Sequence, residues 1–446
     1  MGTLIWTCPQ AVHVRINRND VFAMNRNMRI LASVVLRFDA KPGKTNRIEP
    51  HSDRRAGICF RKTFLPPIFP PMTAMKHQVT HWFCSVAMMS WMSLLVQGVE
   101  PAKPFMAYGA SATSRELVAV RYSQADGTLS SKIVQREPIG CEGAPVIYHE
   151  KFRSLYVLSL RAKEGELNKM VIFSVADDGR LTRKQQLPTK HGSAYASFDR
   201  SGRYLLSVSY FEGHVDVYRL DENGTPAHLG TTFENRNQAH SILTAPNNRS
   251  VYVPYVKDNN AMFQYRFDPQ RGVLRSLDPP RVEVPDGIGP RHVAFHPTKP
   301  FVFFSNEQHL GATSYRMARD GRLSLVQVCD AGKLKTAEGL YASDTTITPD
   351  GRHLFVAVRD FAGKKRDGIH RYRIKEDGHL VHLNMIEADA IPWGLKMSPN
   401  GGLLLVTAAH GETLSAYEIG GDSKLTKRTS LTWGNMIRAV AVVTVK

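Results

Sequence analysis

The feature that most constrains the fold is an internal repeat with a period near 50 residues. From residue 105 to 446, short runs rich in Val, Leu, Tyr and Phe alternate with Gly, Asp, Asn and Pro clusters, without a long amphipathic helical pattern. Alignment on a Pro/Asp-x-Gly turn, clearest at Pro349-Asp350-Gly351, places one position per repeat at Ala144, Ala194, His240, Arg291, Ser343 and Trp393. The intervals are 50, 46, 51, 52 and 50 residues. This period, with four short strands per unit, is typical of a β-propeller blade.

The length of the repeat region predicts seven such blades, since roughly 340 residues divide into units of about 50. A hairpin turn recurs at Asp126-Gly127, Asp178-Gly179, Asp320-Gly321 and Asp377-Gly378, with a looser copy at Arg271-Gly272. The alternating run at 437–445 has no partner strand in its own repeat, and the first unit, from Phe105, is one strand short. We therefore expect the two ends to share a blade and leave no open edge. A pair of β-sandwiches is the alternative all-β fold, but it does not account for the period.

The N-terminal part differs from the repeats. Residues 1–74 carry twelve Lys or Arg against four Asp or Glu and lack periodicity, which predicts a disordered or untranslated leader. Met75 opens a short cationic stretch followed by fifteen uncharged residues, 82–96, and by small residues suited to cleavage after Gly98. We interpret 75–98 as a signal peptide, because the run is too short for a comfortable transmembrane helix. Translation from Met75 would give a periplasmic or secreted protein without a membrane span; the alternative is a buried or interfacial helix in a longer cytoplasmic chain.

The net charge and the motifs of the chain limit the kinds of molecule that we expect it to bind. The net charge is +18, of which the leader contributes +8 and the remainder +10. No helix-turn-helix, zinc-finger or stacked-aromatic motif accompanies this charge, so we expect a small anionic or sugar substrate and no nucleic acid. Cys141 and Cys329 are the cysteines of the repeat region, expected as buried free thiols, with a disulfide between them as the alternative. We expect a monomer.

Two columns of the repeat alignment carry the candidate site. The first lies at the start of each innermost strand, where a purely structural repeat would place small or apolar residues, yet it holds His240, Arg291 and Trp393. His292 follows Arg291, and Asp344 follows Ser343. The second column, at the end of the next strand, contains Tyr210, Glu307, Arg359 and Ala409. Because both columns meet near the ring axis, we expect their polar members to gather in one cleft.

At these residues the chain resembles a known family. Gly289-Pro290-Arg291-His292-Val293-Ala294-Phe295-His296-Pro297, followed by Val302 to Glu307, is similar to the most specific signature of the lactonase-family propellers. Ala239-His240-Ser241 and the run from Thr348 to Arg359 support the match, which spans 105–446 and none of 1–104. The resemblance implies a seven-bladed propeller with active residues His240, Arg291, Glu307 and Arg359. Tyr195 and Thr346 stand where the family has His, and Trp393 stands where phosphogluconolactonase-like members often have Arg.

The resemblance implies a lactone hydrolase acting on a sugar lactone, of the 6-phosphogluconolactonase type. Glu307 is the expected general base, Arg291 and Arg359 the stabilisers of the oxyanion or of an anionic group, and His240 the proton donor. His292, Asp344, Trp393 and Tyr210 are expected to bind substrate. No cofactor or metal is expected, since the sequence lacks a dense ligand cluster, and no Gly-x-Ser-x-Gly elbow is present. A muconate-type lactonising cycloisomerase and a non-enzymatic binding propeller are the alternatives.

Overall fold

The computed structural model describes residues 103–233, 236–334 and 338–446. The leader expected at 1–74 and the signal peptide expected at 75–98 lie outside these residues. Within them, no helix is long and apolar enough to cross a membrane.

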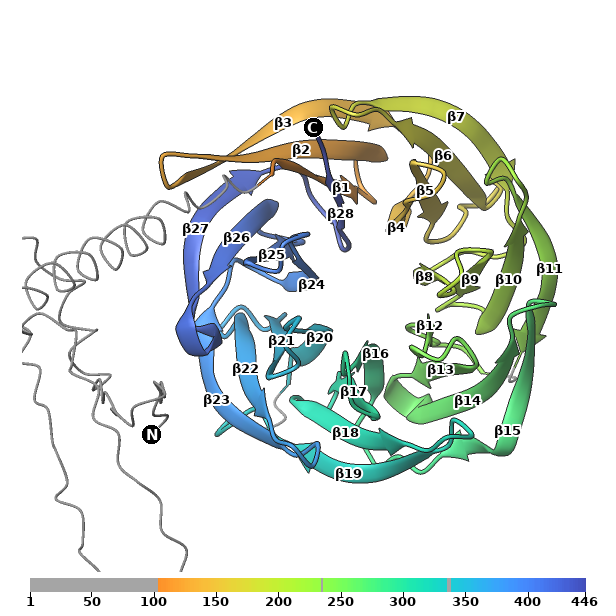
Figure 1. Ribbon diagram of the computed structural model, residues 1–446, viewed down its shortest axis with the longest axis vertical. Helices are drawn as coiled ribbons and strands as arrows, with labels where there is room; N and C mark the ends of the chain where they lie inside the picture. The colour runs from red at the N-terminus through yellow and green to blue at the C-terminus, as the bar shows by residue number, and fades with distance from the viewer. Residues whose placement is uncertain (1–102, 234–235, 335–337) are drawn as a thin grey trace, which may run out of the picture. The chain divides into compact units, whose positions relative to one another are not determined.

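The described chain folds into seven four-stranded antiparallel sheets arranged as the blades of a ring (Figure 1). The blades are numbered here in chain order, with strands given from the ring axis outward. Blade 1 consists of β28 (Ala441–Thr444), β1 (Phe105–Ala110), β2 (Glu116–Ala125) and β3 (Thr128–Pro138), and blade 2 of β4 (Gly143–His149), β5 (Ser154–Ser159), β6 (Lys169–Val175) and β7 (Leu181–Pro188). Blade 3 consists of β8 (Tyr195–Phe198), β9 (Tyr204–Val208), β10 (His214–Leu220) and β11 (Pro226–Phe233), and blade 4 of β12 (Leu243–Thr244), β13 (Ser250–Tyr255), β14 (Ala261–Asp268) and β15 (Val273–Val282). Blade 5 consists of β16 (Pro290–Phe295), β17 (Phe301–Asn306), β18 (Ala312–Met317) and β19 (Leu323–Cys329). Blade 6 consists of β20 (Leu340–Ile347), β21 (His353–Asp360), β22 (Gly368–Ile374) and β23 (Leu380–Glu387), and blade 7 of β24 (Pro392–Met397), β25 (Leu403–Ala408), β26 (Thr413–Ile419) and β27 (Leu425–Thr432). Two short 3₁₀ turns, η2 (Lys257–Asn259) and η3 (Gly421–Ser423), interrupt the strands.

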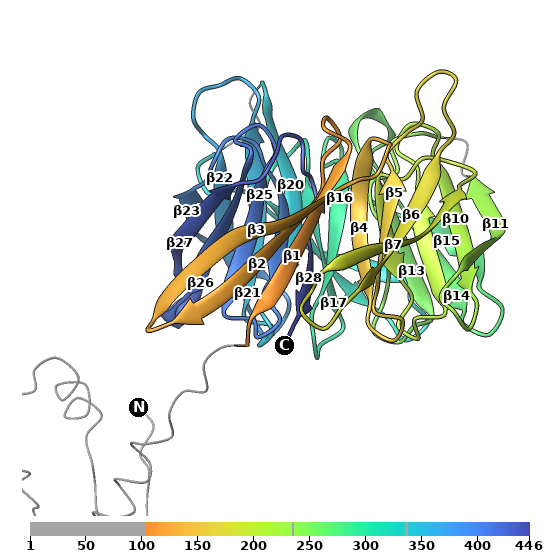
Figure 2. The ribbon, with the colours of Figure 1, turned by 90° about the horizontal axis from the view of Figure 1, so that it is seen from above.

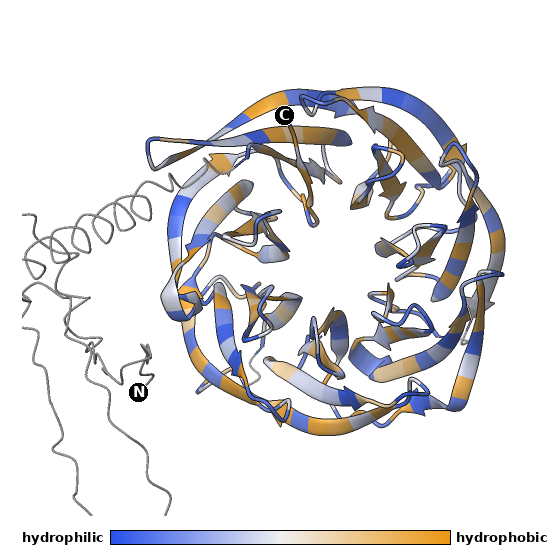
Figure 3. Ribbon diagram, viewed as in Figure 1, coloured by the Kyte–Doolittle hydropathy of each residue, from blue (hydrophilic) through white to orange (hydrophobic). Residues whose placement is uncertain are grey.

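The core lies between the blades. Every residue of β5, β9, β13, β17 and β21 is buried, so these second strands present apolar side chains to both neighbouring sheets. One cluster joins Phe303 of blade 5 to Val356 of blade 6, and another joins Leu206 of blade 3 to Val253 of blade 4. The outermost strands alternate in hydropathy, with one face toward solvent (Figure 3). A single blade therefore cannot bury its faces, and the ring forms only by stacking.

The predicted Asp-Gly turns close the outer hairpins between the third and fourth strands. Gly179, Gly321 and Gly378 have φ of 86°, 93° and 87°, which favours glycine. Each turn also docks on the preceding blade: Tyr108 donates its hydroxyl hydrogen bond to the Gly179 carbonyl at 2.7 Å, and Tyr252 to the Gly321 carbonyl at 2.6 Å. A turn that is local in sequence thus also fixes the contact between neighbouring blades.

The ring closes through the last strand, as predicted. β28 is the innermost strand of blade 1 and pairs antiparallel with β1, with Phe105 opposite Thr444 and Tyr108 opposite Ala441 (Figures 1 and 2). The seven sheets exclude the β-sandwich alternative. Cys141 and Cys329 are both buried and free, so the disulfide alternative is also excluded.

Candidate active site

The innermost strands surround a central cavity of about 670 Å³, a size suited to a small-molecule ligand. The two sequence columns meet here because each innermost strand starts where its antiparallel neighbour ends: Pro290 at the start of β16 lies opposite Asn306 at the end of β17. All eight residues predicted for the site line this cavity, namely His240, Arg291, Glu307, Arg359, His292, Asp344, Trp393 and Tyr210.

A carboxylate held between two guanidinium groups forms the centre of the site. Arg359 donates a 2.7 Å hydrogen bond from Nη2 to Oε1 of Glu307, and the same nitrogen donates to the Ala342 carbonyl at 2.9 Å. Arg291 approaches the other oxygen of Glu307, with 3.9 Å between Nε and Oε2. These residues come from blades 5 and 6, and Arg291 is completely buried. The carboxylate is therefore fixed in place by cations on both sides.

Several polar atoms of this group lack a hydrogen-bond partner among the described residues. They are Nε, Nη1 and Nη2 of Arg291, Oε2 of Glu307, Nε of Arg359 and Nδ1 of His240. Burying a guanidinium group without hydrogen bonds costs free energy, and such groups are rare in folded proteins unless they have a function. Burial and the neighbouring charge of Arg359 lower the pKa of Arg291. The arrangement is that of a site prepared for an oxygen-rich, anionic ligand.

Two histidines stand beside these arginines. His292 Nδ1 lies 2.7 Å from Oδ1 of Asp344, and Oδ2 of Asp344 accepts a hydrogen bond from the Leu395 amide at 2.8 Å. The His240 ring packs edge-on against His292, with 5.3 Å between centroids. Burial and the Arg291 charge lower the pKa of both histidines, that of His240 well below its usual range. His240 is therefore neutral at pH 7, while Asp344 orients His292.

Trp393 stands where a cation was expected from the family pattern, but the structure supplies a cation to the same place. The Arg438 guanidinium lies over the indole ring at 4.8 Å, and those of Arg359 and Arg291 lie over the same ring at 4.5 Å and 5.8 Å. Such cation–π contacts hold guanidinium groups in place while their N–H groups remain available. Nε of Arg438 has no partner among the described residues.

Sequence reasoning missed part of the lining. Lys257, Tyr341, Phe361, Lys396 and Arg438 also face the cavity. The repeat does mark Arg438, because it falls 45 residues after Trp393 and so occupies the same repeat position as His240 and Arg291. Lys257 lies in the 3₁₀ turn η2, which only blade 4 has at that point among the described residues, so no repeat position marks it.

The two other departures from the family pattern, Tyr195 and Thr346, line the same cavity. Tyr195 packs edge-on against His292 at 5.1 Å between ring centroids. Over the residues that the structure describes, no group of three or more His, Cys, Asp or Glu side chains is placed to hold a metal ion.

Known proteins share this fold and sequence pattern. The family model described as "Lactonase, 7-bladed beta-propeller" matches residues 106–439. The 6-phosphogluconolactonases of Enterobacter sp. (strain 638) and Cronobacter sakazakii are each 29% identical to this chain, over 317 and 321 residues; these alignments cover 70% and 71% of this chain and 91% and 92% of the relatives.

Solved structures agree in fold. A periplasmic gluconolactonase from Pseudomonas aeruginosa superposes with a TM-score of 0.66 at 21% identity, covering 77% of this chain and 100% of that one. A putative 6-phosphogluconolactonase from Bacteroides fragilis gives 0.67 at 17% identity, covering 77% and 98%. Since the family model spans three quarters of the sequence and the ring has the seven blades that it describes, the chain belongs to the lactonase family of seven-bladed β-propellers.

Proposed function

We propose that this protein hydrolyses a sugar lactone that carries an anionic group, in the manner of a 6-phosphogluconolactonase. The observation that supports the proposal most strongly is the position of Glu307 between Arg291 and Arg359. One oxygen of its carboxylate and several guanidinium N–H groups have no hydrogen-bond partner among the described residues. Membership of the lactonase family and the two relatives named 6-phosphogluconolactonase support it.

The proposed chemistry needs an activated water, a stabilised oxyanion and a proton for the leaving alkoxide. Glu307 takes a proton from water through its free Oε2, and the resulting hydroxide attacks the lactone carbonyl. Arg291 and Arg359 stabilise the tetrahedral oxyanion. His240 is neutral and has a free Nδ1, so it accepts the proton taken by Glu307 and passes it to the ring oxygen as the C–O bond breaks. Water and lactone are consumed and one hydroxy acid is formed, without a co-reactant.

The charge of the cavity supports an anionic substrate. Five cations, Lys257, Arg291, Arg359, Lys396 and Arg438, line it against two carboxylates, Glu307 and Asp344, a balance of +5 − 2 = +3. In a partly closed cavity such an excess raises the local concentration of anions. Arg438 and Lys257 supply cations in addition to Arg291 and Arg359, so the cavity offers positive charge both to a phosphate and to the lactone carbonyl.

The experiment is hydrolysis of 6-phosphogluconolactone and of unphosphorylated gluconolactone by purified 99–446, beside Glu307→Gln. We expect the variant to lose about two orders of magnitude or more in kcat. Glu418→Gln on the exposed face of β26 is the matched control and should retain full activity. No turnover of either lactone by the wild-type protein would contradict the proposal. Loss of a conjugated-diene absorbance with a muconate substrate would instead identify a lactonising cycloisomerase.

We further propose that translation starts at Met75 and that the protein is exported after cleavage behind Gly98. The composition of 75–98 supports this, and the periplasmic gluconolactonase of Pseudomonas aeruginosa, which shares the fold, is consistent with it. N-terminal sequencing of the native protein tests the proposal, and an intact Met1 would contradict it.

A further inference from the structure

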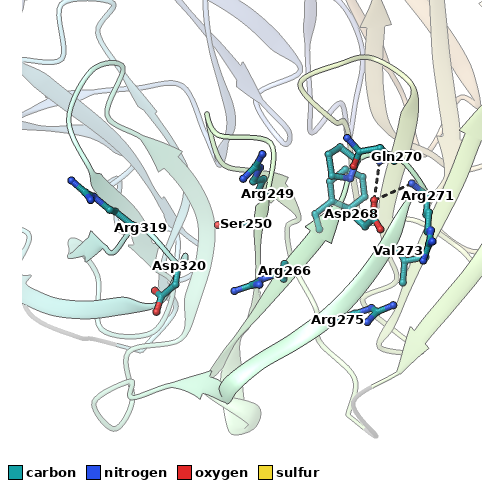
Figure 4. A pocket seen from close by; sticks show the side chains of 12 residues that line it. Arg249, Ser250, Arg266, Asp268, Gln270, Arg271, Val273, Arg275, Arg319 and Asp320 are labelled. Carbon is teal, nitrogen blue, oxygen red and sulfur yellow. Dashed lines mark hydrogen bonds between the residues drawn. The ribbon is translucent and has the colours of Figure 1, made fainter.

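A second cavity, of about 550 Å³, lies outside the central channel and shares no lining residue with it. Five arginines line this groove: Arg249, Arg266, Arg271, Arg275 and Arg319. Figure 4 shows Arg249, Arg266, Arg271 and Arg275 on the strands and turns of blade 4, with Arg319 on the outer hairpin of blade 5. Two acidic residues, Asp268 and Asp320, also belong to the lining, so its formal balance is +5 − 2 = +3.

The two aspartates form no ion pair with the five arginines, and local bonds hold both carboxylates in place. Oδ1 of Asp268 accepts hydrogen bonds from the Gln270 and Arg271 amides at 2.9 and 3.2 Å, the pattern of a turn-forming aspartate. Asp320 binds the Arg322 amide and its guanidinium group at 3.0 and 2.8 Å. None of the five groove guanidinium groups forms an ion pair or side-chain hydrogen bond with another described residue.

The seven blades provide an internal comparison for Arg266. Arg266 directly follows the buried aromatic residue of the third strand. The equivalent residue of every blade lies opposite one residue of the fourth strand in the sheet register. The pairs are Ser123–Ser130, Ser174–Thr182, Arg219–Ala227, Arg266–Arg275, Arg316–Ser324, Arg373–Val381 and Glu418–Thr426. Blade 4 thus places one arginine directly across from another, an arrangement that destabilises a sheet through like-charge repulsion.

Arg319 directly precedes the Asp320-Gly321 pair of its outer hairpin. The corresponding position holds an acid in blades 2, 3 and 6 and a neutral residue in blades 1 and 4, namely Asp177, Glu222, Glu376, Ala125 and Gln270. Two of those acids form ion pairs: Asp177 with Arg153 at 2.8 Å, and Glu376 with Lys299 at 2.5 Å. In the groove the corresponding position adds a cation instead. Arg275 and Arg319 therefore add cations at two repeat positions where the blades compared with them have none.

We propose that this groove binds an anion that carries two or more adjacent phosphate groups. Arg266 and Arg275 are register partners on β14 and β15, and each guanidinium group can donate paired N–H groups to a phosphate. Arg249, Arg271 and Arg319 surround that pair and are available to a second phosphate. The volume lies within the usual range of small-ligand sites. The one aromatic residue among the described lining residues, Phe267, is buried, so no exposed ring is present for a base to stack on, which favours a polyphosphate over single-stranded nucleic acid.

The groove and the catalytic cavity open at opposite ends of the blades. Arg249 lies in the turn between β12 and β13, and Arg271 and Arg319 lie in outer hairpins, all at the end of the blade opposite to that where β16 starts and β17 ends. Arg291 and Glu307 stand at the latter end. A ligand bound in the groove therefore leaves the mouth of the catalytic cavity open on the other face of the ring.

The test is calorimetric titration of the full propeller, residues 99–446, with inorganic tripolyphosphate and with orthophosphate at low ionic strength. The groove variant is R266S/R275T, which installs the Ser174–Thr182 pair of blade 2 and so uses side chains that this fold accepts. The matched control is R219S/R373S, which removes two arginines from the same strand position in blades 3 and 6.

We expect tripolyphosphate to bind the wild-type protein at least about tenfold more tightly than orthophosphate, and the groove variant to lose at least about tenfold in affinity. The control should change by less than about twofold. The groove variant should also melt at a higher temperature than the wild type in low salt, because the repulsion between the two arginines is gone. Lactone hydrolysis should be unchanged in both variants, so failure of this proposal is separable from failure of the proposed function.

Three results would overturn the proposal: equal affinity for the two phosphates, equal weakening by groove and control variants, or far tighter binding of single-stranded RNA with the same arginine dependence. The first two would mean that the charge of the whole surface, and not the groove, attracts the anion. The third would mean that the groove belongs to a nucleic-acid interface.

Discussion

At the scale of the residue, three guanidinium groups around one indole ring define the binding cavity. Arg291, Arg359 and Arg438 all lie within 5.8 Å of the Trp393 ring centroid. Mutual repulsion would disperse them in water, but the ring face and the Glu307 carboxylate keep them together. An anionic substrate would relieve this repulsion, which links substrate charge directly to affinity.

This arrangement gives a prediction for Arg438. It forms no ion pair with Glu307, and the acid in electrostatic range of it is Glu142, outside the catalytic group, so its replacement should weaken substrate binding more than the chemical step. We expect Arg438→Met to raise KM for 6-phosphogluconolactone by roughly 10- to 100-fold, with kcat changed by less than about threefold. Steady-state kinetics with the unphosphorylated lactone provide the control, since its KM should hardly change. Equal effects on both lactones would assign Arg438 to the reacting end of the substrate.

The candidate site could largely be predicted from the sequence because a repeat samples the same point of every blade. His240, Arg291 and Trp393 were found as departures from a column of small residues, and each lines the cavity. A repeat position cannot mark a side chain that comes from a loop of variable conformation. Lys257 comes from the turn after β13, and its proximity to Tyr210, 5.9 Å from Nζ to the ring, depends on loop conformation that no repeat encodes.

At the scale of the element, the outer hairpin connects each blade to its predecessor. The carbonyl at the turn glycine accepts a hydroxyl hydrogen bond from the previous blade in blades 2, 3, 5 and 6. The donors are Tyr108, Tyr156, Tyr252 and Ser314. A neighbouring contact recurs through glutamine: Gln135 accepts from the Leu181 amide and Gln327 from the Leu380 amide. These bonds fix the blade-to-blade angle, on which the size of the central cavity depends.

Removal of one hydroxyl bond should therefore destabilise the ring. Tyr252 is fully buried, and its replacement by Phe leaves the Gly321 carbonyl without that donor. We expect Tyr252→Phe to lower the free energy of unfolding by about 1–3 kcal/mol, measured by urea denaturation. Tyr148→Phe, which removes a partly exposed hydroxyl, should cost less than about 0.5 kcal/mol. Similar costs for both would show that the hydroxyl bond to the turn is not what stabilises the interface.

The sequence predicted the strands but not their irregularities. In all seven blades the pairing of the third and fourth strands shifts register. In six of them the shift ends at the buried aromatic residue, as between Val217 and Tyr218 or between Ser314 and Tyr315; in blade 1 it lies earlier, between Ala119 and Val120. Such bulges increase strand twist and let the outermost strand curve around the ring. No turn residue marks them, because they result from closure of the whole ring and not from a local preference.

At the scale of the whole molecule, buried histidines make stability depend on pH. Burial lowers the pKa of His370 to about 4, with His382 beside it at 3.1 Å, and lowers the pKa of His292, His353 and His382 as well. The unfolded chain therefore binds protons below about pH 6.5 that the folded chain does not. Stability should fall as pH drops from 6.5 toward 4.

For His370 alone this effect is roughly 2 kcal/mol at pH 5, and it is absent at pH 7.5. We expect His370→Asn to show a smaller loss in the free energy of unfolding between pH 7.5 and 5 than the wild-type protein. Denaturant titrations at the two pH values measure this difference. An unchanged pH dependence would show that His370 becomes protonated in the folded protein as readily as in the unfolded chain.

Ring closure gives the last prediction. β28 is the innermost strand of blade 1. Its side chains Ala441 and Val443, together with Val445 just after the strand, belong to the cluster between blades 1 and 2. Deletion of residues 441–446 should open an edge along β1 and expose this cluster. We expect the melting temperature to fall by more than about 10 °C, with aggregation on heating, as followed by circular dichroism and light scattering. Retention of the wild-type melting temperature would contradict this role of the last strand.

The closing strand also determines when the protein can become complete. β1 and β28 are neighbours in blade 1, yet their first residues, 105 and 441, are 336 residues apart in the chain. At ordinary elongation rates a ribosome needs roughly 15 to 70 s to cover that distance, during which β1 lacks its partner. The nascent chain thus carries an unsatisfied template strand through nearly its whole synthesis. Holdase chaperones that shield strand edges are the cellular factors on which yield of this enzyme should most depend.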